Sequence, residues 1–175
     1  MRLTPTLIDG VVVVESESAA DDRGSFVRTW CRDTFAAAGL DFEPIQESLS
    51  RNLKTATLRG MHIQGAPFGE QKLVRCLRGR IFDVAVDLRP DSASYCRWFG
   101  LELDESRDAA LFLPRGVAHG FITLSDDAWV HYMIDTAYAP GHAGGVRWDD
   151  PAFGIAWPTE PVVISDRDRN WPDHV

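Results

Sequence analysis

Alternating apolar and polar positions dominate the chain, and residues 82–88 show the pattern most clearly. Apolar side chains occupy every second position there, and Asp83, Ala85 and Asp87 fill the positions between them. Successive side chains of a strand point to opposite faces, so this period of two predicts a β-strand with one apolar face. Asp87 adjoins a turn and is expected to face solvent, whereas Asp83 lies mid-strand and faces either solvent or an internal pocket.

Short strands account for most of the remaining chain. The predicted strands are residues 26–30, 45–52, 57–64, 71–78, 81–88, 98–103, 110–113, 118–124 and 129–134. One helix is predicted over residues 32–39 and ends at Gly39. Many short strands at near-regular spacing favour a sandwich or barrel over alternating strands and helices. We therefore expect an all-β fold with a few short peripheral helices, in a single domain spanning residues 1–175.

Composition narrows the classes of protein that fit this pattern. The chain has 175 residues, of which 45% are hydrophobic and 25% charged, as is usual for a soluble globular protein. The formal net charge of −8 argues against a non-specific nucleic-acid binder, although arginines can still gather around an anionic small molecule. No apolar run is long enough to cross a membrane. The cysteines have no CxxC spacing, which predicts reduced thiols and a cytoplasmic location.

Candidate chemistry lies on two neighbouring predicted strands. His62 stands three residues after Arg59, and Lys72 begins the next apolar run. A histidine that accepts a proton, beside cations that stabilise an oxyanion, suits the abstraction of a proton from carbon. Arg59 and His62 have opposite parity, so a regular strand cannot point both inward. A bulge at Gly60 would resolve this conflict.

A second histidine, His119, closes the segment Pro114-Arg115-Gly116-Val117-Ala118-His119, which resembles the second half of the cupin signature. Metal-binding cupins carry two histidines in the first half, where this chain has His62-Ile63-Gln64. A metal site would then need His62, His119 and Glu70 as ligands. Because Gln64 replaces one ligand, we expect no metal and no other cofactor. A metal-dependent cupin enzyme remains the alternative.

Taken together, the motifs are similar to those of the dTDP-4-dehydrorhamnose 3,5-epimerase family, metal-free members of the cupin superfamily. The matching segments are residues 22–26, 58–64, 72–75, 82–87, 114–121, 132, 138–140, 146–151, 154–158 and 164–168. The order and spacing of these segments make the resemblance specific. It implies a cupin jelly-roll barrel.

The resemblance also implies a reaction. Members invert C3 and C5 of a nucleotide-linked 4-keto-6-deoxyhexose, or one of the two carbons, through an enolate. On this reading His62 is the base, Asp168 orients it, and Tyr132 is the acid on the opposite face. Lys72 would stabilise the charge on the C4 oxygen. The expected partner is the nucleotide-diphosphate 4-keto-deoxysugar itself.

Further residues are implied to bind the substrate, and Tyr138 among them would stack on the nucleotide base. The substrate-binding set is Arg23, Gln46, Arg59, Asp83, His119, Tyr138 and Arg167. Family members are typically homodimers that exchange N-terminal strands, so Arg23 and Arg28 would act in the partner's site. The acidic end of the chain, residues 169–173, is expected to pack down and help hold Asp168. His131, His142 and His174 are expected to be solvated.

The chain departs from the family pattern at four positions. Arg28 and Ala143 stand where glutamate is usual, Ser48 where asparagine is usual, and Met133 where lysine is common. Three of these positions belong to the nucleotide-contacting part of the pattern. The nucleotide carrier, the exact sugar and the number of carbons inverted therefore stay open at this stage.

Overall fold

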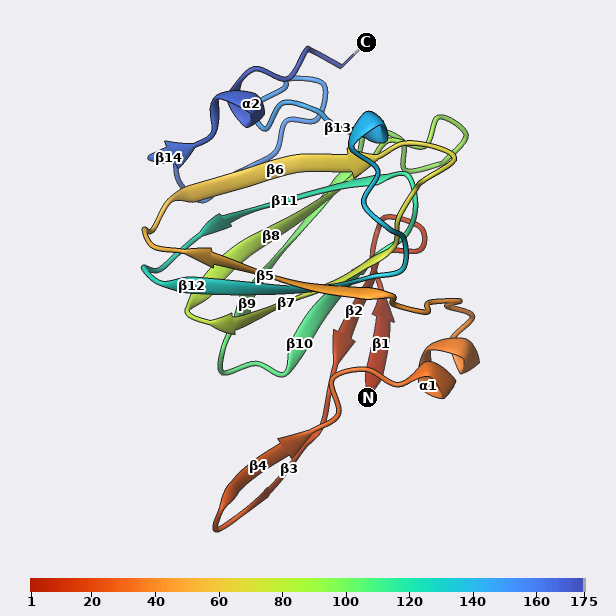
Figure 1. The fold of residues 1–175 in the computed structure, drawn as a ribbon, viewed down its shortest axis with the longest axis vertical. Coiled ribbons are helices and arrows are strands. Elements are labelled where there is room, and N and C mark those ends of the chain that lie inside the picture. Colours follow the sequence, from red (N-terminus) through yellow and green to blue (C-terminus); the bar gives the residue numbers. More distant parts are fainter. Residues whose placement is uncertain (175) are drawn as a thin grey trace.

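Two antiparallel sheets face each other in the computed structural model, which describes residues 1–174 (Figure 1). In spatial order the first sheet consists of β1 (Arg2–Pro5), β2 (Val12–Glu15), β10 (Ala109–Leu113), β7 (Lys72–Arg78), β12 (Ala128–Ile134) and β5 (Gln46–Asn52). The second consists of β13 (Ala143–Gly145), β6 (Thr57–Gln64), β11 (Val117–Thr123), β8 (Arg80–Asp87) and β9 (Trp98–Asp104), with β14 (Val163–Ile164) parallel to β6. This arrangement confirms the all-β jelly roll.

The remaining elements lie at the periphery. A hairpin of β3 (Ser18–Asp21) and β4 (Gly24–Val27) projects beyond the two sheets. The helices are α1 (Arg32–Ala37), the 3-10 turn η1 (Pro140–His142) and α2 (Asp166–Arg169). No helix within residues 1–174 is long and apolar enough to span a membrane.

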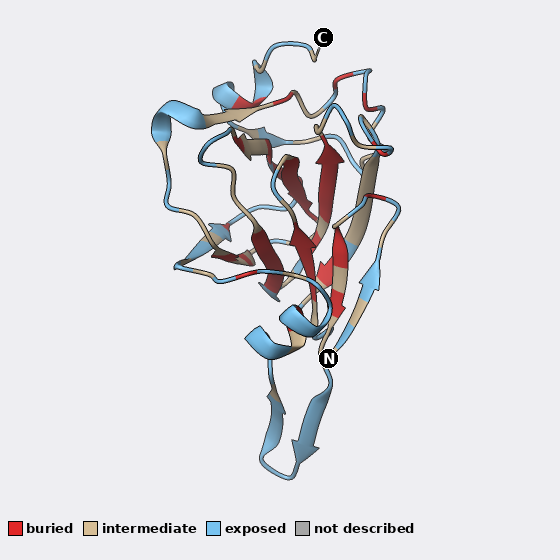
Figure 2. Ribbon diagram, turned by 90° about the vertical axis from the view of Figure 1, so that its right-hand side faces the viewer, coloured by how far each residue is buried: buried red, intermediate tan, exposed pale blue. Residues whose placement is uncertain are grey.

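The main core fills the space between the sheets. Val74 and Val130 contribute from the first sheet, and Ile81, Ala85 and Phe121 contribute from the second. Figure 2 shows the buried residues concentrated in the strands of the body, while the β3–β4 hairpin is exposed except at its half-buried last residue, Val27. Several of these strands are buried on both faces, so the period of two in the sequence separates two differently packed faces and not a buried face from a solvated one.

Strand β8 is buried on both faces. Val84 and Val86 pack beneath Phe153 and Val146, which belong to the segment that covers the outer face of the second sheet. Asp87 was expected to face solvent, and this expectation was wrong: the side chain is fully buried. The loop that follows β8 folds back over it, so that its carboxylate accepts hydrogen bonds from the side chains of Arg89, Ser92 and Ser94.

The predicted elements agree with the structure in the body and differ at the ends. The strand expected at residues 26–30 is β4, at Gly24–Val27, within the hairpin. Strands β1 and β3 were not predicted, because an exposed edge strand or hairpin has no clean alternation. Strand β2 was also not predicted: it lies inside the sheet, and its sequence is a short apolar run in which no polar residue alternates. The predicted helix is present and shorter, ending before Gly39, whose φ of +77° suits glycine.

The bulge expected at Gly60 is confirmed. His62 pairs with His119 across β6 and β11, yet Arg59 pairs with Phe121, so β6 carries one extra residue between the two pairs. Gly60 has a φ of +149°, and a Cβ atom there would lie 2.6 Å from the Cα of Gly120. Only glycine fits this position. The extra residue turns Arg59 and His62 toward the same cavity.

Candidate active site

A cavity opens between the two sheets and has two adjoining parts, of about 320 and 300 Å³. Ser48, His62, Lys72 and Ile134 line both parts. The outer part also contains Gln46, Ile63, Gln64, Glu70, Tyr138, Ala143, Gly144 and Arg167. The inner part also contains Ser50, Arg59, His119 and Tyr132. Predicted residues from five separate strands, the Tyr138 loop and helix α2 therefore share one cavity.

His62 and Asp168 form a histidine–carboxylate dyad. The distance from His62 Nε2 to Asp168 Oδ1 is 2.7 Å, and the other Asp168 oxygen accepts the Gly60 amide at 3.3 Å. Burial alone would raise the pKa of Asp168, but the hydrogen bond and charge of His62, with the Gly60 amide, outweigh it and lower the pKa. The ionised carboxylate only accepts hydrogen bonds, so Nε2 donates and Nδ1 keeps its lone pair. His62 is thus arranged as a base.

Lys72 is held by a neighbour that the sequence pattern did not assign to it. Its Nζ lies 2.7 Å from Oε1 of Glu70, and the two side chains are 10% and 12% exposed. Glu70 was considered only as a ligand in the alternative metal site. Glu70 lies two residues before Lys72, which begins β7. Side chains two residues apart in an extended chain point to the same side, so this spacing could have predicted the pair.

Tyr132 lies in the inner part of the cavity, with its ring 5.8 Å from that of His119 in an edge-on arrangement. Burial, followed by the negative charge of Asp83, raises the pKa of Tyr132 well above its ordinary value, although Arg59 opposes this. The phenol therefore keeps its proton at neutral pH. A protonated hydroxyl at a cavity wall is equipped to act as an acid.

Asp83 was expected to meet the substrate, and this stays a prediction, although the side chain is not among the residues that line the cavity. The side chain points into the barrel but is fully buried, and Oδ1 lies 2.8 Å from Nε2 of His119. His119 lines the cavity, whereas Asp83 lies outside its lining. The imidazole meets Oδ1 alone, and Oδ2 is buried without a hydrogen-bond partner among the described residues. Asp83 orients His119.

The outer part of the cavity carries the exposed candidates. Tyr138 is 62% exposed, and Arg167 Nη2 donates to the Ala143 carbonyl at 3.4 Å. Gln46 holds the Thr136 carbonyl through its amide at 3.1 Å. Two of the positions that depart from the family pattern, Ser48 and Ala143, also lie here. These two of the four departures thus lie where a ligand would be recognised.

Arg23 is not brought to this cavity within one chain. It lies in the turn of the projecting hairpin, where its side chain is 90% exposed and pairs with Asp21 at 2.5 Å. Arg28 is exposed just beyond the same hairpin. Any role for either arginine at the site therefore requires a second copy of the chain.

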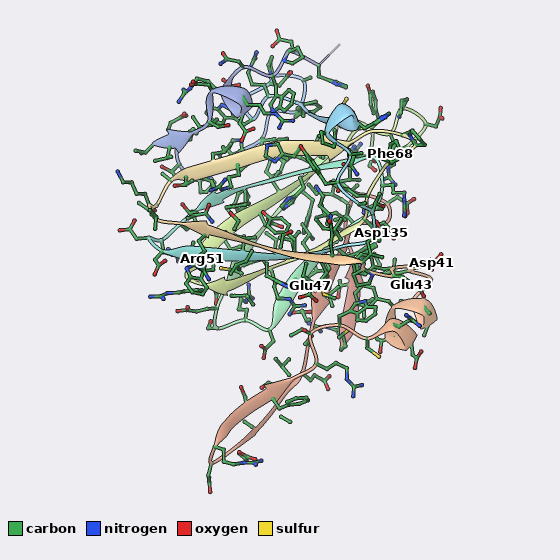
Figure 3. All side chains as sticks on the ribbon, in the orientation of Figure 1. Asp41, Glu43, Glu47, Arg51, Phe68 and Asp135 are labelled. Atoms are coloured by element: carbon green, nitrogen blue, oxygen red, sulfur yellow. The ribbon has the colours of Figure 1, made fainter. Side chains whose placement is uncertain are left out.

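Gln64 is buried and its amide is fully used. Nε2 donates to the carbonyls of Phe68 at 2.7 Å and Ala137 at 3.1 Å, and Oε1 accepts the Ala139 amide at 2.8 Å. Figure 3 shows Phe68 at the end of β6 where these loops meet. Gln64, which stands where metal-binding cupins have a histidine ligand, thus ties the Tyr138 loop to β6.

The candidate metal ligands have other partners. His62 pairs with Asp168, His119 with Asp83, and Glu70 with Lys72. Within residues 1–174, no group of three or more histidine, cysteine, aspartate or glutamate side chains is arranged to hold a metal ion. The alternative metal set of His62, His119 and Glu70 is therefore not assembled.

Comparison with known proteins agrees with this geometry. The family profile described as dTDP-4-dehydrorhamnose 3,5-epimerase matches residues 5–174. The chain belongs to this family. It is accordingly an isomerase, an epimerase acting on carbohydrates. The membership confirms the resemblance inferred from the motifs.

Individual members of the dTDP-4-dehydrorhamnose 3,5-epimerase family match over nearly the whole chain. The enzyme of that name from Methanothermobacter thermautotrophicus is 42% identical over 174 residues, covering 97% of this chain and 92% of that protein. A dTDP-4-dehydrorhamnose 3-epimerase from Streptomyces niveus is 39% identical, covering 97% and 82%. The crystal structure of the 3,5-epimerase from Bacillus anthracis, with TDP and pyrophosphate bound, superposes with a TM-score of 0.95 at 34% identity, covering 99% of each chain. The relatives thus include enzymes named for epimerisation at both C3 and C5 and an enzyme named for epimerisation at C3 alone.

Proposed function

We propose that the chain is a metal-independent epimerase that inverts C3, C5 or both in a nucleotide-linked 4-keto-6-deoxyhexose. One observation carries the proposal: His62 and Tyr132 reach the cavity from opposite walls. His62 belongs to β6 of the second sheet and Tyr132 to β12 of the first. A base and an acid on opposite sides of a ring are what inversion at carbon requires.

The steps follow from these positions. Nδ1 of His62 takes the proton from a carbon next to the C4 ketone, and the electron pair moves onto the C4 oxygen. The ammonium of Lys72, whose side chain is 10% exposed, stabilises that oxyanion. Tyr132 then returns a proton to the same carbon from the opposite face. Exchange with solvent restores both side chains, so no cofactor is consumed.

Substrate recognition is proposed for the outer part of the cavity and for the Arg59 and His119 side of the inner part. Tyr138 offers an exposed ring for a nucleotide base, and Arg59, Arg167 and His119 offer donors for phosphate or sugar oxygens. The relatives that carry dTDP in their names support a thymidine carrier. Relatives named 3,5-epimerase and 3-epimerase share the fold, so inversion at one carbon is the second candidate.

A homodimer is also proposed. The exposed β3–β4 hairpin presents Phe26 at 75% exposure, and the edge strand β5 is flanked by Ile45 and Leu53 at 66% and 80%. Glu47 and Arg51 mark β5 along the free edge of its sheet (Figure 3). Exposed apolar side chains beside an unpaired strand edge favour an interface between copies. Pairing there would carry Arg23 to the partner's cavity.

A cytoplasmic location and a single-domain organisation are also proposed. The cysteines form no disulfide within the described residues, which fits a reducing cytoplasm. One shared core between the sheets favours a single domain over residues 1–175.

The decisive experiment is proton NMR in D2O with dTDP-4-keto-6-deoxyglucose and EDTA. Deuterium incorporation at both C3 and C5 supports the 3,5-epimerase, and incorporation at one carbon supports the single-site enzyme. His62→Ala should lower the exchange rate by about 10²–10⁴-fold with the fold intact by circular dichroism. Absence of exchange across a panel of 4-keto sugar nucleotides, or full exchange by His62→Ala, would overturn the proposal.

A further inference from the structure

The turn that carries Asp168 is too short to be stable by itself. Helix α2 spans only Asp166–Arg169, and its N-cap Ser165 accepts the Asp168 amide at 3.1 Å. A single helical turn fixes several backbone dihedral angles but gains only one or two hydrogen bonds. Formation of such a turn in isolation is therefore unfavourable in free energy. Yet Asp168 must stay within hydrogen-bonding distance of His62, 106 residues away in the sequence. Other contacts must hold the turn in place.

Trp171 supplies the first of these contacts. Its ring lies against Gly145 so closely that a Cβ atom on Gly145 would be 2.6 Å from the Trp171 ring. Gly145 is the residue of β13 that pairs with His62 on β6. The guanidinium of Arg167, on the Asp168 turn itself, lies 4.9 Å from the centre of the Trp171 ring. Trp171 thus lies between the backbone next to His62 and the turn that bears Asp168.

The residues after Trp171 are anchored in turn. Arg147 binds the Asp173 carboxylate, and the His174 amide donates to Asp150 at 2.7 Å. The His174 ring, expected to be solvated, instead lies 2.8 Å from the Tyr95 hydroxyl through Nε2. In Figure 1 this C-terminal segment lies beside β13, on the same side of the barrel as α2. We name residues 170–174 the C-terminal latch.

We propose that the C-terminal latch positions Asp168 against His62, and that Trp171 is its central positioning residue. This inference rests on the proposed function of His62 as a base. Trp171 lines neither part of the cavity, so it acts through the turn and not on the substrate. Without its ring the Asp168 turn separates from β6 for part of the time. His62 then loses its fixed tautomer and orientation, and the proton-abstraction step slows.

Three variants isolate this role. Trp171→Ala removes the packing against Gly145. Trp171→Phe keeps an aromatic ring and loses no hydrogen bond, because the indole N–H has no partner among the described residues. Trp129→Ala is the matched control, since that tryptophan lies on the outside between Arg51 and Arg78, with their guanidinium carbons 4.7 and 5.5 Å from its ring.

The kinetic test measures deuterium incorporation into substrate at saturation. We expect Trp171→Ala to lower kcat by about 10- to 100-fold with a smaller change in KM, Trp171→Phe to recover most of the loss, and Trp129→Ala to match the wild type. In an Asp168→Asn background Trp171→Ala should cost less than about twofold, because the group it positions is already absent. An undiminished kcat in Trp171→Ala, or an equal loss in both backgrounds, would overturn the inference.

A second measurement needs no substrate. Nitrogen-15 NMR of the His62 ring should show the Nε2–H tautomer in the wild type and a tautomer mixture in Trp171→Ala at the same folded fraction. An unchanged ring spectrum would overturn the latch whatever the reaction is. Absence of exchange by the wild-type enzyme on every 4-keto sugar nucleotide would instead overturn the proposed function, so the two failures are distinguishable.

Discussion

Lys72 and Glu70 form an ion pair inside the cavity, with Nζ 2.7 Å from Oε1 and both side chains nearly buried. The carboxylate of Glu70 fixes the position of the Lys72 ammonium and partly offsets the positive charge that a ligand in the cavity would meet. Either effect bears on how Lys72 stabilises an enolate oxygen. The two effects are separable by substitution.

Glu70→Gln keeps an acceptor for Nζ, whereas Glu70→Ala leaves the ammonium without one. If position is the main effect, Glu70→Ala lowers kcat about tenfold and Glu70→Gln stays within about threefold of the wild type. Steady-state epimerisation rates at saturating substrate provide the measurement. Equal losses in both variants would show that holding Lys72 in place requires the ionised carboxylate of Glu70 and not only an acceptor for Nζ. A gain in kcat would show that the partial neutralisation of Lys72 by Glu70 is the larger effect.

Tyr132→Phe should slow the return of the proton and leave substrate affinity nearly unchanged. Because burial and Asp83 raise the pKa of Tyr132, the phenol stays protonated as the pH rises through about 9. The wild-type kcat should therefore show no decline from loss of this proton over that range. Rates and product configuration by NMR test both points, and a defect confined to KM would remove Tyr132 from the acid role.

Gln64→Ala should raise KM more than it lowers kcat. Its amide holds Phe68, Ala137 and Ala139, the residues that flank the Tyr138 loop. Loss of these bonds frees Tyr138 and should weaken nucleoside-diphosphate binding about tenfold, or about 1.4 kcal/mol. Calorimetric titration with dTDP measures this, with Ser106→Ala on the outer surface as the control. Unchanged affinity would contradict the tethering role.

Asp87→Asn should destabilise the fold without touching the cavity. The buried carboxylate accepts from Arg89, Ser92 and Ser94, and its loss should cost on the order of 3 kcal/mol, or about 6–12 °C in Tm. Burial would raise the pKa of Asp87, but these hydrogen bonds lower it well below its usual range.

The sign of the pH dependence follows from that lowered pKa. The stabilisation by Asp87 is fully present above the unfolded-state pKa of about 3.9 and is lost as the pH falls toward the lower folded-state pKa. The difference between wild type and Asp87→Asn in urea unfolding should thus be largest near neutral pH and shrink below about pH 4. A difference that is independent of pH would contradict an ionic origin.

Strands with an apolar and a polar face were predictable because their periodicity is local. The same is true of the bulge at Gly60, which the opposite parity of Arg59 and His62 required. Edge elements such as β1 and β3 were not predictable, because their side chains are mostly exposed on both faces and carry no alternation. Asp87 was misjudged for a related reason: a turn covers it, and turn conformation is not encoded in the period of the strand.

The sequence by itself determined which side chains could carry the chemistry, His62, Lys72, Tyr132 and Asp168, and the strands that bear most of them. Only the tertiary structure decided their partners and placement: His62 with Asp168, His119 with Asp83, and His62 and Tyr132, the proposed base and acid, on opposite walls. The reason is physical. Alternation is a property of neighbouring residues, whereas pairing between strands and packing between sheets join residues far apart in the chain.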